Sequence, residues 1–440
     1  GNPYPIHNSK FIIPMNHLLR ILWTLVLPLM AVAPTAAAIS GSFIQPWLVA
    51  DWDDARWQQE YAMLSEAGIH RLIFMHTVHT DKEGKAQAVY PTRIEGIAPG
   101  TNDLLDGCLR NAQKAGFEVI VGLNFDERWW NTSKWTPEWI TEQMMLGNRV
   151  AQEITENYRS HYPGTLKGWY WVWEIEASFI VNSPELGDLL VNALNINLDC
   201  LTRLTPDLSV ILSPFMNSQR CTAEAHAKVW GGILRNAHLK DGDILAPQDC
   251  VGSGFLKPEE TAQWFKALAA VIPASPKINF WANIESFDQR FWTTAPLNRI
   301  KMQADNVAPY VSDMITFAYS HYYSPERIRP ALHRAYCQWA KSSELPAAAR
   351  PAQVNSLSIE KDGEKTLLKW TFNPQEPTLL GHHIYKDGIL IGDVQSNHWT
   401  ATATPDTATA TFDLTGKGNG HYEVRAYNVI GEEAEKISDF

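Results

Sequence analysis

Short apolar runs alternate with amphipathic stretches along most of the chain, over residues 41–342. The runs are rich in β-branched and aromatic residues, and each is short enough to form one buried strand. They cover residues 42–47, 71–77, 118–125, 166–174, 209–215, 243–249, 277–285 and 314–322. Buried strands that alternate with helices predict a parallel sheet with both faces covered.

The stretches between these runs have apolar residues at helical spacing and recognisable ends. The clearest predicted helices cover residues 54–68, 102–116, 136–158, 257–272 and 324–341. Gly68 and Gly116 close the first two, as glycine commonly does at a helix C-terminus. Thr136 is a typical N-cap for the third. Pro258 and Pro325 lie near the starts of the last two helices, where proline is tolerated.

Eight units of a strand followed by a helix favour a closed barrel over an open doubly wound sheet. An open nucleotide-binding sheet would carry a glycine-rich turn after its first strand, and residues 45–54 contain no glycine. We therefore predict an α/β fold, a (β/α)8 TIM barrel, over residues 39–342. The functional residues of such a barrel lie at the carboxyl ends of its strands.

The sequence pattern changes near residue 343. Residues 343–352 form a linker of prolines and alanines without apolar periodicity. Residues 353–440 contain alternating strand patterns separated by Asp-Gly and Asn-Gly turns, which predict an all-β sandwich. Trp370 in an early strand, YKDG in the middle and YEVRAYNVIGE near the end resemble a fibronectin type III domain.

Composition narrows the choice of partner. The formal net charge of −11, without a basic patch or tail, argues against nucleic acid and anionic membranes. The 18 tryptophans offer flat faces on which a ligand can stack. We expect a monomer that acts on a carbohydrate.

Residues 1–38 predict an N-terminal extension and a signal peptide. An apolar run over residues 21–32 precedes three alanines at 36–38, the pattern of a secretory cleavage site. A transmembrane anchor is the alternative, but the run is short and Pro28 interrupts it. We expect the mature chain to begin near Ile39, to be secreted or periplasmic and to have no stable membrane insertion.

Five cysteines, an odd number, are scattered along the chain. None of them has the spacing of a metal-ligand pair, and we expect no metal and no cofactor. An oxidising compartment would allow a disulfide, and Cys200 with Cys221 is the pairing that we predict.

Polar side chains follow the apolar part of several predicted strands. The segment GWYWVWEIE over residues 168–176 ends in Glu174 and Glu176, which share one face by the two-residue period of a strand. Glu285 likewise ends the apolar run NFWANIE. Further polar residues near strand ends are His76, Asn124, Gln248, Asp249 and Asn283.

Two carboxyl groups facing each other across a barrel mouth are what glycosidic cleavage requires. We assign Glu174 as the acid/base, because it lies closer to its strand than Glu176, and Glu285 as the nucleophile. Tryptophans around Glu174 should raise its pKa, while Glu285 stays ionised beside Asn283 and solvent. One of these carboxylates could instead orient a neighbour or cap a helix. Asp249 is open between a sugar-binding or assisting acid and a turn residue.

The aromatic residues divide into two groups. Trp169, Trp171 and Trp173 alternate with the glutamate face and should pack under helices. Those at or beyond strand ends are candidates for sugar stacking as well as for the core: Trp47, Trp129, Trp130, Trp281 and Trp292. Tyr319 and Tyr322 could bind sugar hydroxyls, and we interpret His76 and His79 as hydrogen-bonding groups and not as metal ligands.

The motifs GWYWVWEIE, SPF, ILAPQDCVG, FWANIESF and FAYSHYYSP together resemble a family of uncharacterised bacterial barrel proteins described as glycosyl hydrolases of unknown function. The resemblance spans about residues 40–340 and implies a site at Glu174, Gln248, Asp249 and Glu285. The chain also resembles the large glycosidase superfamily with its acid/base after strand 4 and its nucleophile after strand 7. That superfamily has an asparagine before the acid/base, where this chain has Trp173.

Two functions therefore remain open from the sequence. The first is an exported glycoside hydrolase, retaining if its carboxyl groups lie about 5–5.5 Å apart and inverting at about 6.5–9.5 Å. The alternative is a non-catalytic carbohydrate-binding barrel whose carboxylates only accept hydrogen bonds. A scaffold assembled by the C-terminal domain would leave the polar residues at the strand ends unexplained.

Overall fold

The computed structural model describes residues 39–395 and 407–435. The predicted signal peptide lies outside the described residues. Within them, no helix is both long enough and apolar enough to cross a membrane.

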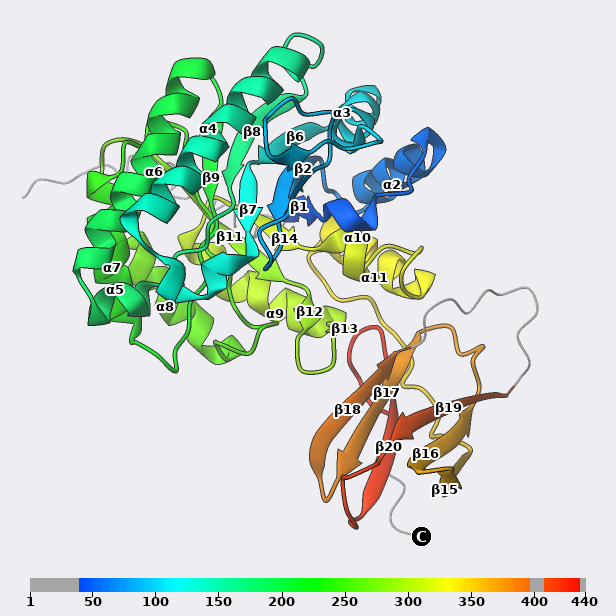
Figure 1. Ribbon diagram of the computed structural model, residues 1–440. Helices are drawn as coiled ribbons and strands as arrows, with labels where there is room; N and C mark the ends of the chain where they lie inside the picture. Colours follow the sequence, from blue (N-terminus) through cyan, green and yellow to red (C-terminus); the bar gives the residue numbers. More distant parts are fainter. Residues whose placement is uncertain (1–38, 396–406, 436–440) are drawn as a thin grey trace, which may run out of the picture. The chain divides into compact units, whose positions relative to one another are not determined.

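Eight parallel strands close into a barrel, surrounded by helices (Figure 1). The strands are β1 (Ile39–Ile44), β2 (Arg71–Phe74), β6 (Glu118–Gly122), β8 (Leu166–Trp171), β9 (Ser209–Leu212), β10 (Ile244–Leu245), β11 (Asn279–Glu285) and β14 (Asp313–Phe317). They neighbour one another in chain order, and β14 pairs with β1 to close the ring. The predicted TIM barrel is confirmed, and each of the eight predicted strands overlaps an observed one.

Alternate side chains of the strands point to the barrel interior and to the helices. In β8, Trp169 and Trp171 face α6 (Glu185–Leu204) and donate from Nε1 to Thr205 Oγ1 at 2.9 Å and to Asn197 Oδ1 at 3.0 Å. The interior is filled by Phe43, Ile73, Ile120, Tyr170, Val172, Ile211, Ile244, Ala246, Trp281, Ile315 and Ala318. Burial on both faces explains why these strands read as continuous apolar runs.

The helices that follow the strands have the predicted caps. They are α2 (Asp54–Glu66), α3 (Leu104–Ala115), α4 (Pro137–Tyr158), α5 (Ala177–Asn182), α6, α7 (Ala223–Asn236), α8 (Thr261–Ala269), α9 (Leu297–Val307), α10 (Tyr319–Tyr322) and α11 (Pro330–Ser342). Thr136 caps α4, and Gly116 is left-handed at the end of α3. The last helix begins at Pro330 and not near Pro325, because a proline inside a helix removes a hydrogen bond and clashes with the preceding turn.

Short elements surround the mouth of the barrel at the carboxyl ends of the strands. A four-stranded sheet joins β3 (Val78–Thr80), β4 (Ala86–Ala88), β5 (Ile97–Ala98) and β7 (Asn124–Asp126). The 3-10 helices at this end are η1 (Pro46–Leu48), η2 (Glu127–Trp130), η3 (Thr132–Lys134) and η4 (Pro258–Glu260), whereas η5 (Ala308–Tyr310) precedes β14 at its amino end. A two-stranded pair, β12 (Phe287–Asp288) with β13 (Thr293–Thr294), follows β11.

The C-terminal part folds as two antiparallel three-stranded sheets that fit a β-sandwich. They are β15 (Ser356–Asp362), β16 (Lys365–Phe372) and β19 (Ala408–Asp413), and β17 (Leu379–Lys386), β18 (Ile389–Gln395) and β20 (Tyr422–Asn428). Trp370 lies fully buried among their side chains. No helix or strand lies between Ser342 and Ser356. The fibronectin type III assignment and the linker boundaries remain predictions.

The expected disulfide is not formed. All five cysteines are free: Cys108, Cys200, Cys221, Cys250 and Cys337. The structure places Cys200 on α6 and Cys221 in the loop before α7.

Candidate active site

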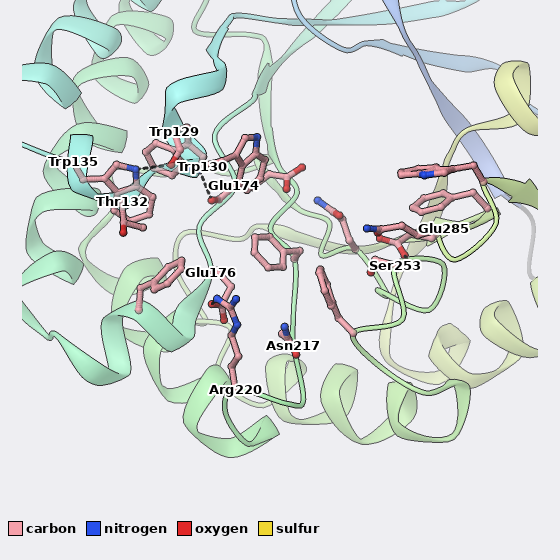
Figure 2. A pocket seen from close by; sticks show the side chains of 17 residues that line it. Trp129, Trp130, Thr132, Trp135, Glu174, Glu176, Asn217, Arg220, Ser253 and Glu285 are labelled. Atoms are coloured by element: carbon pink, nitrogen blue, oxygen red, sulfur yellow. Dashed lines mark hydrogen bonds and ion pairs between the residues drawn. The ribbon is translucent and has the colours of Figure 1, made fainter. Parts of the chain in front are cut away.

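A cavity of about 630 Å³ opens where the barrel strands end, and Figure 2 shows the side chains that line it. They are Trp129, Trp130, Thr132, Trp135, Glu174, Glu176, Phe179, Phe215, Asn217, Arg220, Gln248, Ser253, Phe255, Glu285, Phe287, Gln289 and Trp292. The segments that carry them follow β6, β8, β9, β10 and β11. The cavity has the size and the mainly apolar lining of a small-molecule site.

Glu174 lies three residues beyond the end of β8, on an extended segment and not on the strand itself. The backbone is held there by Trp129, whose Nε1 donates to the carbonyl oxygen of Glu174 at 3.0 Å. Burial raises the pKa of Glu174 to about 7, although a hydrogen bond from Gln248 opposes the shift. Near neutral pH this carboxyl group can therefore hold a proton and release it.

Glu285 is the last residue of β11 and is only 3% exposed. The backbone N–H of Ser253 donates to its Oε2 at 2.7 Å. Gly252 lets the loop come this close, because a Cβ there would lie 2.5 Å from the carbonyl oxygen of Phe287. The guanidinium of Arg299 donates to the carbonyl oxygen of Glu285 at 2.9 Å. The N–H and the guanidinium both favour the charged form of the carboxyl group.

Asp249 is fully buried behind Glu285 and does not line the cavity. Its Oδ1 accepts from the backbone N–H of Glu285 at 3.2 Å and of Val251 at 3.3 Å, and its Oδ2 accepts from Gln303 Nε2 at 2.6 Å. These contacts make Asp249 a residue that holds the end of β11 in place. Because Asp249 does not line the cavity, it is not placed to bind a sugar directly, and that prediction is corrected.

The expectation that Glu285 stays ionised beside Asn283 and solvent is corrected. Burial raises the pKa of Glu285 well above its usual range, and the charge of Asp249 raises it further. Burial also raises the pKa of Asp249. Two buried carboxyl groups that interact electrostatically resist double ionisation, while Ser253 and Arg299 oppose the shift at Glu285. Asn283 does not stabilise the charge of Glu285, because its Nδ2 donates to Ser213 Oγ at 3.1 Å.

Glu176 lines the cavity but is nearly fully buried, and it caps a helix. Its Oε1 accepts from the backbone N–H of Ser178 at 3.0 Å at the start of α5, and its Oε2 is 3.4 Å from Arg220 Nη1. Glu174 and Glu176 do not share a strand face, because β8 ends at Trp171. Glu176 therefore acts as a helix cap, which is one of the structural roles that the sequence had left open for these carboxylates.

Aromatic side chains form much of the cavity wall. Trp129 and Trp130 lie on η2, and Trp292 lies between β12 and β13. Trp135 packs on Trp129 with ring centroids 4.3 Å apart and donates from Nε1 to its carbonyl oxygen at 2.8 Å. Three of these tryptophans were sequence candidates for stacking, whereas Trp135 was not.

Three candidate residues lie away from the cavity. Trp281 belongs to the barrel interior, and the guanidinium of Arg71 lies 4.7 Å from its ring centroid. Asn124 is buried and donates from Nδ2 to the carbonyl oxygen of Gln143 on α4 at 3.1 Å. Tyr319 is buried on α10, with its hydroxyl on His333 Nδ1. Each has a structural partner, so these three predictions of sugar contact are corrected.

Two further candidates support the site from behind. Asn283 lies beneath it in the barrel, in a parallel bridge with Gln248, which does line the cavity. Tyr322 stacks on Phe287 with ring centroids 5.5 Å apart. Burial, and then the charge of Glu285, raise the pKa of Tyr322 to about 12, so its hydroxyl stays protonated. Neither residue lines the cavity, which corrects their predicted sugar contacts.

The remaining two candidates, Trp47 and His76, line a separate cavity together with His79 and Glu127. The structure therefore brings together Glu174, Glu176, Gln248 and Glu285 but not these two.

Several lining or supporting residues were not found from the sequence: Trp135, Asn217, Arg220, Ser253, Gln289, Arg299 and Gln303. The only usable signal was position, because Asn217 and Ser253 closely follow the strands predicted over residues 209–215 and 243–249. Arg299 and Gln303 lie inside α9, where nothing in the pattern distinguishes them from ordinary helix residues.

One group of metal-ligating side chains occurs among the described residues. The ligand atoms of Glu66, His333 and Cys337 lie within 4.8 Å of one another. The three residues belong to α2 and α11, and none of them lines the cavity. The carboxylates that line the cavity accept hydrogen bonds from backbone and side-chain donors of the protein.

The chain is similar to one protein family and to several solved structures. A family model described as Domain of unknown function (DUF4434) matches residues 39–329. A structure from Bacteroides thetaiotaomicron, provisionally named an alpha-L-fucosidase, is 19% identical, with 74% of this chain and 94% of that chain covered and a TM-score of 0.55. A family 39 glycoside hydrolase from Bacteroides cellulosilyticus is 11% identical, with 90% and 82% covered and a TM-score of 0.43. No curated protein matches the sequence.

Proposed function

The chain belongs to the family described as a domain of unknown function (DUF4434), and we propose that its barrel is a glycoside hydrolase that cleaves O-glycosidic bonds of an oligosaccharide or polysaccharide. One observation carries the proposal. Glu174 and Glu285, two carboxyl groups with raised pKa values, line one aromatic-walled cavity at the carboxyl ends of the barrel strands. Glycosidic cleavage needs such a pair of carboxyl groups.

The surroundings of the two carboxyl groups support different roles. Glu174 is buried, and among the described residues the amide of Gln248 is the group that stabilises its charge, so Glu174 suits the acid that protonates the leaving oxygen. Burial and Asp249 raise the pKa of Glu285, but the N–H of Ser253 and the field of Arg299 oppose this shift and stabilise the anion once the proton has left. We propose Glu285 as the nucleophile of a retaining reaction, with a covalent glycosyl-enzyme intermediate on its carboxylate.

The wall of the cavity supports a sugar as the substrate. Sugar rings have an apolar face and a hydroxyl edge, and the site offers Trp130 and Trp292 for the face and Asn217, Gln248 and Gln289 for the edge. We also propose that the protein is exported and acts as a monomer.

Hydrolysis of a panel of nitrophenyl glycosides and of soluble polysaccharides tests the proposal. The wild type should release product, and Glu174→Gln and Glu285→Gln should each lose at least about 10³-fold in turnover of unactivated substrates. Glu142→Gln, an exposed change on α4 outside the cavity, is the matched control and should keep full activity. Binding of a glycan without hydrolysis by the wild type would instead support the carbohydrate-binding alternative.

A further inference from the structure

A second cavity of about 520 Å³ opens at the mouth of the barrel, and we call it the Trp47 pocket. It is lined by Pro46, Trp47, Ala50, His76, His79, Gln87, Ala88, Val89, Gly100, Thr101, Asn102, Leu104 and Glu127. These residues come from segments that follow β1 and β2 and from the small sheet at the mouth. The proposed reaction uses none of them.

Exposed tryptophan is the first sign of a ligand. Trp47 is 60% exposed, although so large an apolar side chain is ordinarily buried. Among the described residues only two other tryptophans are more than half exposed, Trp130 at 55% and Trp292 at 67%. Both line the catalytic cavity, so every exposed tryptophan in the described part of the chain lines one of these two cavities. Flat apolar faces open to solvent are suited to stacking.

Polar groups next to Trp47 supply hydrogen bonding. The rings of His76 and His79 stack with centroids 5.2 Å apart, and His79 Nε2 lies 3.1 Å from Glu127 Oε1. The Nδ1 of His76 is buried and has no hydrogen-bond partner among the described residues. His79 and Glu127, each about one-third exposed, offer polar atoms to a ligand in the pocket.

Aromatic contacts connect the Trp47 pocket with the catalytic cavity along one side. Trp47 contacts His321 at 5.1 Å between ring centroids, and His321 contacts Tyr322 at 4.2 Å. Tyr322 in turn stacks on Phe287, a lining residue of the catalytic cavity.

A second connection runs through η2. Glu127 at its start lines the Trp47 pocket, while Trp129 and Trp130 line the catalytic cavity. His79 is paired across the sheet with Phe125, whose ring lies 6.0 Å from that of Trp130. The two cavities are therefore neighbours that share the same short helix.

We propose that the Trp47 pocket is a second sugar subsite, so that the substrate is an extended glycan chain that lies across both cavities. The inference rests on the proposed glycosidase function and specifies its substrate class. A sugar in this pocket would stack on Trp47 and place hydroxyl groups at His76, His79 and Glu127. Several sugar residues, and not a single terminal one, are then bound at once.

Calorimetric titration of the Glu285→Gln protein tests the proposal, because bound glycan is not consumed. The probes are cellohexaose, mannohexaose, xylohexaose and chitohexaose, each beside its own disaccharide. For the hexasaccharide that binds, adding Trp47→Ala should weaken affinity at least about tenfold more than for the disaccharide. Trp47→Phe should restore part of the loss, and thermal unfolding confirms that each variant is folded. Met302→Ala, an exposed change on α9 outside both cavities, is the matched control.

Equal losses for both chain lengths, no loss at all, or no binding of any hexasaccharide would overturn the subsite. Hydrolysis of the same panel by the protein with intact Glu285 is scored separately. Binding that depends on Trp47 without any hydrolysis would refute the glycosidase and retain the pocket. If the protein hydrolyses hexasaccharides and Trp47→Ala leaves the KM unchanged, the glycosidase function is retained and the Trp47 pocket is refuted as a subsite.

Discussion

Replacement of Glu174 by glutamine gives a prediction that can be worked from the structure. If Glu174 is the acid, the wild-type rate depends on its protonated fraction, and a pKa of about 7 makes that fraction roughly nine-tenths at pH 6 and about 1% at pH 9. Glu285 must lose its proton in both proteins. Its pKa is governed by burial, Asp249, Ser253 and Arg299, so it should titrate alike in the variant.

The ratio of wild-type to Glu174→Gln kcat/KM therefore isolates Glu174. It should fall by about two orders of magnitude between pH 6 and pH 9, with its midpoint near pH 7. The assay is initial-rate hydrolysis of the methyl glycoside of the sugar that the nitrophenyl panel identifies, because its leaving group requires a proton. The nitrophenyl glycoside of the same sugar, whose leaving group needs no proton, is the control and should show a small ratio that changes little with pH.

Two results would refute this reasoning. A ratio that does not change with pH would mean that Glu174 donates no proton. A ratio with its midpoint near the ordinary glutamate value would mean that the cavity does not raise the pKa of Glu174.

Three further predictions concern the same structure. The raised pKa of Glu174 gives stability that is complete below the ordinary value of 4.5 and is lost as pH rises through about 7. Glu174→Gln should therefore unfold like the wild type at about pH 4 and be more stable at about pH 8, by at most about 3 kcal/mol, in thermal unfolding at both pH values. Asp249→Asn removes the charge that raises the pKa of Glu285, so the acidic limb of the pH–rate profile should move to lower pH; an unmoved limb in a folded variant would contradict the coupling. Since the five cysteines are free, dithiothreitol should leave the melting temperature unchanged, and alkylation of the unfolded chain without reductant should label all five.

The sequence pattern was sufficient for the barrel but not for the details of its mouth. Strands such as β8 and β11 are buried on both faces, so they appear as unbroken apolar runs that end where the polar mouth begins. The expectation that functional residues follow the ends of these apolar runs correctly brought Glu174 and Glu285 to one cavity. It failed for Trp281, which lies four residues before Glu285 and hence about 13 Å closer to the opposite end of the barrel.

The remaining contacts depend on segments that meet only in three dimensions. Ser253 reaches Glu285 because a loop after β10 turns toward β11, and Arg299 comes from a helix that follows both. The pKa of Glu285 was predicted wrongly for the same reason. The sequence predicts that Asp249 lies at a strand end, but it does not show that its side chain accepts from the backbone N–H of Glu285.

The most direct test of the account is to identify the residue that carries the covalent intermediate. The protein is incubated with the 2-deoxy-2-fluoro glycosyl fluoride of the sugar that the nitrophenyl panel identifies, and the labelled peptide is sequenced by mass spectrometry. The account predicts one added glycosyl unit, attached to Glu285, and no label on the Glu285→Gln protein. Hydrolysis of substrate without any trapped intermediate, or a label on Glu174 or another residue, would contradict it.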